Sequence, residues 1–145
     1  MAVEFTTPST EASVSPATTV TNSLPNGSEG TTFTLENNTN KALYYKIRLS
    51  LASLTPTGAP SISLVEYGPN TTATPSSQRS SNQGIGGKTI SVQTLTTTAE
   101  AKSVEFLHIV VPPFGMKYSF INSCGVTWPS SGNDVLVQYY GEENA

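Results

Sequence analysis

The chain has 145 residues, of which 36% are hydrophobic and 12% are charged, and its formal net charge at pH 7 is -3. A chain of this length is sufficient for a single domain with a hydrophobic core. The chain is slightly acidic and lacks the clusters of lysine and arginine that attract phosphate backbones or anionic lipids. We therefore expect neither nucleic acid nor a membrane as a partner.

The residue types favour strands over helices. Threonine and serine are abundant, whereas the strong helix formers alanine, leucine, glutamate, lysine and arginine are sparse. Threonine suits a pleated sheet and serine suits turns, so the composition predicts an all-β fold. Cys124 is the only cysteine, and stability therefore has to come from packing or assembly rather than from an internal disulfide.

The first thirty residues are mostly polar and contain too few apolar side chains to offset the entropy of ordering them. We therefore predict an extended N-terminal arm over residues 1–30, followed by a β-sandwich domain over residues 31–145. The arm is either a disordered tail or a strap that orders against a partner. In the second case its apolar side chains would make the contacts: Val3, Phe5, Val14, Val20 and Leu24.

The clearest strand follows a predicted hairpin turn at residues 37–40. Within residues 43–51, every second side chain is apolar, and this period of two is typical of a half-buried strand. The face predicted to pack in the core consists of Leu43, Tyr45, Ile47, Leu49 and Leu51. A further strand is expected at residues 61–67. The polar stretch that follows, up to residue 88, is long enough to be a functional or mobile loop.

Four more strands are expected in the second half, at residues 90–95, 104–111, 116–120 and 135–140. Residues 104–111 are apolar at nearly every position, which predicts a central strand covered on both faces. Seven or eight short strands separated by turn residues indicate a two-layer antiparallel sandwich. Its topology is either jelly-roll-like or immunoglobulin-like, since the strand pattern does not give the strand order.

The sequence offers no convincing catalytic set, and we expect the protein not to be an enzyme. His108 is the only histidine and lies within the apolar stretch 104–111, which favours a packed or interface side chain over a catalytic one. Residues 84–89 end in Gly-Lys-Thr, but a strand rather than a helix is predicted to follow, so a phosphate-binding loop is rejected. We expect no metal and no cofactor.

Aromatic side chains are the better candidates for binding. Tyr44, Trp128, Tyr139 and Tyr140 fall on faces or turns that the predicted strands leave partly exposed. Tyrosine and tryptophan are enriched at protein interfaces, so these residues are candidate partner contacts. Two alternatives stay open: they stack on carbohydrate, or they complete the core.

Three stretches, residues 43–63, 111–122 and 130–143, resemble a group of small virion proteins of tailed phages, the capsid decoration (cement) proteins. The shared pattern is a proline-rich corner, a Lys-aromatic strand that ends in asparagine, a Ser-Gly-Asn turn, a last strand with aromatics and an acidic end. The chain departs from this pattern in its long Thr- and Ser-rich start and at Trp128 and Pro129.

The resemblance implies a jelly-roll-like protein that binds the outer surface of the coat lattice and bridges capsomers. Its implied partners are the phage major capsid protein and further copies of itself, as a dimer or trimer. Residues 1–8 do not resemble a secretory signal, so we expect synthesis in the host cytoplasm and a final location on the capsid exterior. The alternative is a carbohydrate- or receptor-binding module of a phage tail or fibre.

Overall fold

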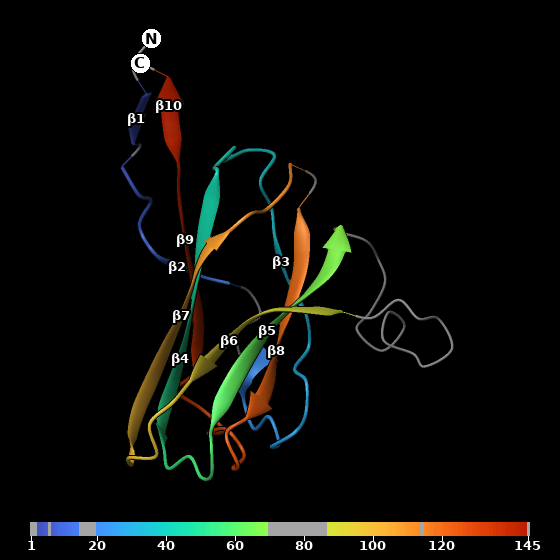
Figure 1. Ribbon diagram of the computed structural model, residues 1–145, viewed down its shortest axis with the longest axis vertical. Coiled ribbons are helices and arrows are strands. Elements are labelled where there is room, and N and C mark those ends of the chain that lie inside the picture. The colour runs from blue at the N-terminus through green and yellow to red at the C-terminus, as the bar shows by residue number, and fades with distance from the viewer. Residues whose placement is uncertain (1–2, 6, 15–19, 70–86, 114, 145) are drawn as a thin grey trace, which may run out of the picture.

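The computed structural model describes residues 3–5, 7–14, 20–69, 87–113 and 115–144, and it is all-β (Figure 1). The strands are β1 (Val3–Phe5), β2 (Ala12–Ser13), β3 (Phe33–Leu35), β4 (Tyr44–Leu54), β5 (Ser61–Pro69), β6 (Lys88–Thr94), β7 (Glu100–Ile109), β8 (Met116–Ser123), β9 (Asp134–Tyr140) and β10 (Glu142–Asn144). Of the long loop expected before residue 88, residues 70–86 lie outside the described part.

The strands from β2 to β9 form two four-stranded antiparallel sheets, with the orders β2-β9-β4-β7 and β3-β8-β5-β6, packed as a sandwich, and β1 and β10 form a separate two-stranded sheet. Strand pairing is nested around the hairpin β5–β6, because β4 pairs with β7, β3 with β8, β2 with β9 and β1 with β10. The pairs β4–β9 and β5–β8 complete the two sheets. A nested ribbon wound into two four-stranded sheets is a jelly roll, which confirms the predicted fold class.

The alternation predicted for residues 43–51 is confirmed in β4. Ile47 and Leu49 are fully buried, and their polar neighbours are only half-buried on the outer face. Leu43 is the exception, with 44% of its surface exposed. It precedes the first residue of β4 and lies at the end of the sheet, where the sandwich stops covering the inner face.

The prediction of a central strand at residues 104–111 is wrong. β7 lies at the edge of its sheet, with β4 as its only hydrogen-bonded neighbour among the described strands. Val104 and Phe106 point into the core, whereas Leu107 is 51% exposed and Val110 is 61% exposed. The continuous apolar run therefore reflects exposed apolar side chains and not a strand covered on both faces.

Aromatic side chains fill the space between the sheets. The Phe120 ring centroid lies 5.4 Å from that of Phe33, 5.9 Å from that of Phe106 and 6.4 Å from that of Trp128. Trp128 is only 2% exposed. The expectation that Trp128 contacts a partner is thereby corrected, because its indole is part of the core.

The second half of the expected arm also packs on the sandwich. Val20 and Leu24 belong to the hydrophobic core, and the backbone from Leu24 to Gly30 is hydrogen-bonded to β8 and the loop after it. Leu24 accepts from the Trp128 backbone N–H over 3.0 Å, and Gly30 donates to the Phe120 carbonyl over 2.9 Å. Val20 and Leu24 are thus core residues rather than partner contacts, since burying both offsets the cost of ordering a mostly polar segment.

The first half of the expected arm supplies two short strands. β2 extends the edge of the first sheet beside β9, and Val14 packs partly buried against the core. β1 pairs with β10 in register Val3↔Asn144 to Phe5↔Glu142, so both ends of the chain lie together beyond the sandwich (Figure 1). We call this pair the terminal ribbon. The side chains of Val3 and Phe5 lie outside the described part.

Candidate functional site

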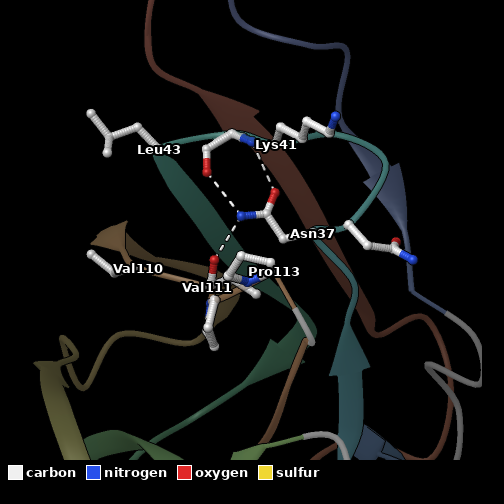
Figure 2. Close-up of a pocket in the computed structure, with 9 residues that line it drawn as sticks. Asn37, Lys41, Leu43, Val110, Val111 and Pro113 are labelled. Carbon is white, nitrogen blue, oxygen red and sulfur yellow. Dashed lines mark hydrogen bonds between the residues drawn. The ribbon is translucent and has the colours of Figure 1, made fainter.

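A largely apolar groove of about 460 Å³ opens at the end of the sandwich where β4 begins, beyond the end of β7 (Figure 2). Leu43 lines it and also contacts Gly141, the residue that leads into the terminal ribbon: a Cβ added to Gly141 would lie 3.0 Å from the Leu43 Cβ. We call it the end groove. Its lining residues are Asn37, Asn38, Lys41, Ala42, Leu43, Val110, Val111, Pro112 and Pro113.

The shape of the end groove is fixed by the buried side chain of Asn37. Its Nδ2 donates to the Ala42 carbonyl over 2.9 Å and to the Val111 carbonyl over 2.6 Å, and its Oδ1 accepts from the Ala42 backbone N–H over 2.9 Å. The Tyr45 hydroxyl approaches the same Oδ1 to 3.2 Å. Figure 2 shows this carboxamide between the loop before Leu43 and the Val111 carbonyl, so one side chain holds both walls.

Two of the most exposed apolar side chains of the described chain line the end groove. These are Leu43 and Val110, with Pro112 and Pro113 beside them. Concave sites lined mainly by apolar side chains are where ligands and partners preferentially bind. The end groove is therefore the first candidate binding surface.

A β-bulge shapes a second surface, on the outer face of the sheet β2-β9-β4-β7. Ile47 pairs with Phe106 and Tyr45 with Ile109, so Lys46 alone faces both Leu107 and His108. His108 has a φ of 56°, in the left-handed region that side chains rarely adopt. A bulge re-aims the side chains at its position, and here both Leu107 and His108 are exposed. Of the two roles expected for His108, a packed or an interface side chain, its exposure excludes the packed one, and the interface one stays a prediction.

The re-aimed histidine joins two of the predicted tyrosines. The His108 ring centroid lies 5.4 Å from that of Tyr44 and 5.9 Å from that of Tyr140, and both contacts are edge-on. The two tyrosine rings are 5.7 Å apart and inclined by 37°. The Tyr140 hydroxyl lies 2.8 Å from His108 Nδ1 and accepts from the His108 backbone N–H over 3.1 Å. We call Tyr44, His108 and Tyr140 the aromatic cluster.

Tyr139, the neighbour of Tyr140, lies on the opposite face of β9. Its ring centroid is 5.8 Å from that of Tyr45, a buried core residue, and 36% of its surface is exposed. The four predicted aromatic contacts thus divide into Tyr44 and Tyr140 in the cluster, Tyr139 apart from them and Trp128 in the core.

Sequence reasoning missed Leu43 and Val110 as exposed residues and His108 as a member of the cluster, because alternation gives no sign of a sheet end or a bulge.

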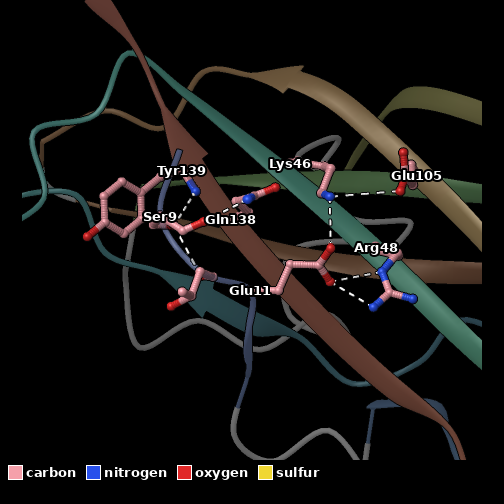
Figure 3. Close-up of polar contacts among 8 residues, drawn as sticks. Ser9, Glu11, Lys46, Arg48, Glu105, Gln138 and Tyr139 are labelled. Carbon is pink, nitrogen blue, oxygen red and sulfur yellow. Dashed lines mark hydrogen bonds and ion pairs between the residues drawn. The ribbon is translucent and has the colours of Figure 1, made fainter. Parts of the chain in front are cut away.

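A charged clip holds β2 on the same outer face (Figure 3). Glu11 reaches across β9 to β4, where its carboxylate accepts from Lys46 Nζ over 2.9 Å and from Arg48 Nη2 over 2.8 Å. Lys46 Nζ also lies 3.8 Å from Glu105 Oε1. The hydrogen bonds from Lys46 and Arg48 lower the pKa of Glu11 below its ordinary value.

This clip gives a testable pH dependence. A lowered folded-state pKa means that the ion pairs stabilise the fold above the ordinary value of 4.5 and that this contribution is lost as the pH falls through the folded value. Because Glu11 is partly exposed, we expect Glu11→Gln to cost less than about 1 kcal/mol at pH 7. Urea midpoints of both proteins should differ at pH 7 and converge at a pH low enough to protonate Glu11 in the folded state. An equal difference at both pH values would contradict the role of the clip.

Cys124, the cysteine of the chain, is buried in the core. Burial raises the pKa of the Cys124 thiol, which disfavours the thiolate. Among the described residues, no three His, Cys, Asp or Glu side chains come together in a way that could hold a metal ion. None of the described residues forms a helix with the length and hydrophobicity that crossing a membrane requires.

Comparison of the chain with family models, with curated proteins and with solved structures found no match. The assignment of function therefore depends on the two surfaces and on the sequence pattern.

Proposed function

We propose that the protein is a capsid decoration protein of a tailed phage, which binds the outer surface of the coat lattice through the end groove and does not act as an enzyme. The observation that supports this most is the exposure of Leu43 and Val110 beside the terminal ribbon, at one end of a well-packed jelly roll. A protein that presents its apolar surface at one end can stand on a lattice with the opposite end in solvent.

A repeated lattice can compensate for the small contact that the end groove offers, because many copies bind together. A groove of about 460 Å³ buries few side chains, and a single interface of this size binds weakly. Repetition across neighbouring capsomers, or assembly of the chain into a dimer or trimer, raises the effective concentration of each contact. The proposed partners are therefore the major capsid protein and further copies of this chain.

The test is co-sedimentation of the chain with capsids of the phage that encodes it, after bound proteins have been stripped off. We expect saturable binding, and we expect the double variant Leu43→Asp, Val110→Asp to bind at least about tenfold more weakly, because it places two charges in the contact. Val92→Asp is the matched control, since Val92 is 53% exposed on β6, in the other sheet.

Two results would refute this function. One is the failure of the wild-type chain to bind capsids at any concentration tested. The other is an equal loss of binding in Val92→Asp, which would show that added charge alone, and not the end groove, determines occupancy. Urea midpoints of all variants should match that of the wild type, because all three positions are exposed.

A further inference from the structure

We infer that the aromatic cluster is a binding site for an uncharged pyranose of a saccharide. This inference goes beyond the proposed function and is independent of it, because the cluster lies on the outer face of the sheet β2-β9-β4-β7 and not in the end groove. The argument has three steps: the apolar surface of the cluster, its directed polar groups and its local charge.

The first step is the shape of the apolar surface. Tyr44 and Tyr140 are neighbours across the β4–β9 pair and are both half-buried, with ring centroids 5.7 Å apart and ring planes inclined by 37°. Leu107, 51% exposed at the bulge, adds an exposed aliphatic side chain on β7. One face of a pyranose presents C–H groups, which pack well against the exposed parts of aromatic rings.

The second step is the fixed orientation of His108. The Tyr140 hydroxyl accepts the backbone N–H of His108 and also pairs with Nδ1, 2.8 Å away, so the imidazole ring is held in one orientation. The other ring nitrogen, Nε2, donates in one neutral tautomer and accepts in the other, and a sugar hydroxyl can pair with it in either case. Within the described residues the Tyr44 hydroxyl has no hydrogen-bond partner. The cluster thus offers one oriented ring nitrogen and one free hydroxyl to the hydroxyl groups of a sugar.

The backbone at His108 fixes the position of its side chain beside the two tyrosines. A non-glycine residue with a φ of 56° in an edge-strand bulge is strained, and such strain is concentrated at binding and catalytic sites. The same bulge also serves the core, because its extra residue turns Ile109, three positions after Phe106, back to the inner face, where both side chains are buried.

The third step is the local charge, which favours an uncharged ligand. Lys46 faces the bulge, but its Nζ is already 2.9 Å from Glu11 and 3.8 Å from Glu105 (Figure 3). The carboxylate of an acidic sugar would be repelled by Glu105, and Lys46 is already paired and does not offset that repulsion. A basic sugar would compete with Lys46 for the carboxylates of Glu11 and Glu105. A neutral pyranose is subject neither to this repulsion nor to this competition.

The test uses isothermal titration of the whole chain with cellohexaose, maltohexaose and mannohexaose, with polygalacturonate as an acidic probe. We expect a dissociation constant on the order of 0.1–1 mM for at least one of the neutral sugars and none for polygalacturonate. Tyr44→Ala should weaken binding at least about tenfold, and Tyr140→Phe should weaken it severalfold, because the phenyl ring remains while the hold on His108 is lost.

Tyr139→Ala is the matched control, since it removes a tyrosine from the opposite face of the same strand and should leave sugar binding unchanged. Urea midpoints show which variants are folded. The inference is overturned if no neutral sugar binds, if polygalacturonate binds more tightly, or if Tyr139→Ala loses as much affinity as Tyr44→Ala. It is also overturned if Tyr44→Ala binds sugar normally but loses capsid binding, because the cluster would then be a protein contact.

Discussion

Replacing Phe120 by alanine is expected to lower the free energy of unfolding by about 3–5 kcal/mol. Phe120 is fully buried, and its ring contacts Phe33 of β3, Phe106 of β7 and Trp128 of the loop after β8. Truncation removes the favourable free energy of burying the ring. It also leaves a cavity, because the two sheets cannot both move inward to fill the space. Urea unfolding monitored by Trp128 fluorescence measures the effect directly, because the indole lies against the deleted ring.

Two further variants make this result interpretable. Val92→Ala, at an exposed position of β6, should change stability by no more than about 0.5 kcal/mol. If Phe120→Ala does not fold, Phe120→Leu should fold with a loss of about 1–1.5 kcal/mol, because most of the volume is retained. A small effect of Phe120→Ala, similar to that of Val92→Ala, would show that the two sheets are not packed through this ring.

Asn122→Ala is expected to cost about 3 kcal/mol or more, although it removes no apolar contact. Asn122 is fully buried, and its Nδ2 donates to the carbonyls of Leu24 and Val126, each over 2.8 Å. Its Oδ1 accepts from the Cys124 backbone N–H over 2.8 Å. Removal of the carboxamide takes this partner from the Cys124 N–H and the Val126 carbonyl, at about 1–3 kcal/mol each. The Leu24 carbonyl keeps its hydrogen bond from the Trp128 backbone N–H.

The matched control is Asn38→Ala, an exposed asparagine for which we expect a change within about 0.5 kcal/mol. Hydrogen exchange adds a local measurement. In Asn122→Ala the amides of residues 24–30 should exchange faster than those of β4, since this side chain joins that segment to the loop after β8. Equal stability of the two alanine variants would contradict the bridging role.

The two candidate surfaces do not depend on the same residues as these stability predictions. The end groove is organised by Asn37, and the aromatic cluster by the bulge at His108, whereas Phe120 and Asn122 hold the sheets and the N-terminal segment together. Binding and stability can therefore be measured with separate sets of variants. A variant that loses capsid or sugar binding while keeping its urea midpoint identifies a contact residue.

Much of the fold could be predicted from local pattern. The composition indicated an all-β chain, and the alternation in residues 43–51 identified the buried face of β4, because successive side chains of a strand point to opposite faces. Tyr44 and Tyr140 could be selected for the same reason: each lies on the outward face of its strand. This information is local and holds whatever the neighbours of the strand are.

The tertiary structure alone decided which strands are neighbours, and the site depends on that. β7 is an edge strand because β4 alone, of the described strands, pairs with it. The extra residue at Leu107 and His108 is defined only by the pairing of Tyr45 and Ile47 with β7. Val20, Leu24 and Trp128 are apolar residues in polar surroundings, so their burial depends on the sheets that they cover. Sequence alternation specifies the face of a strand; long-range pairing and packing specify edges, bulges and covered faces, because these are properties of two segments at once.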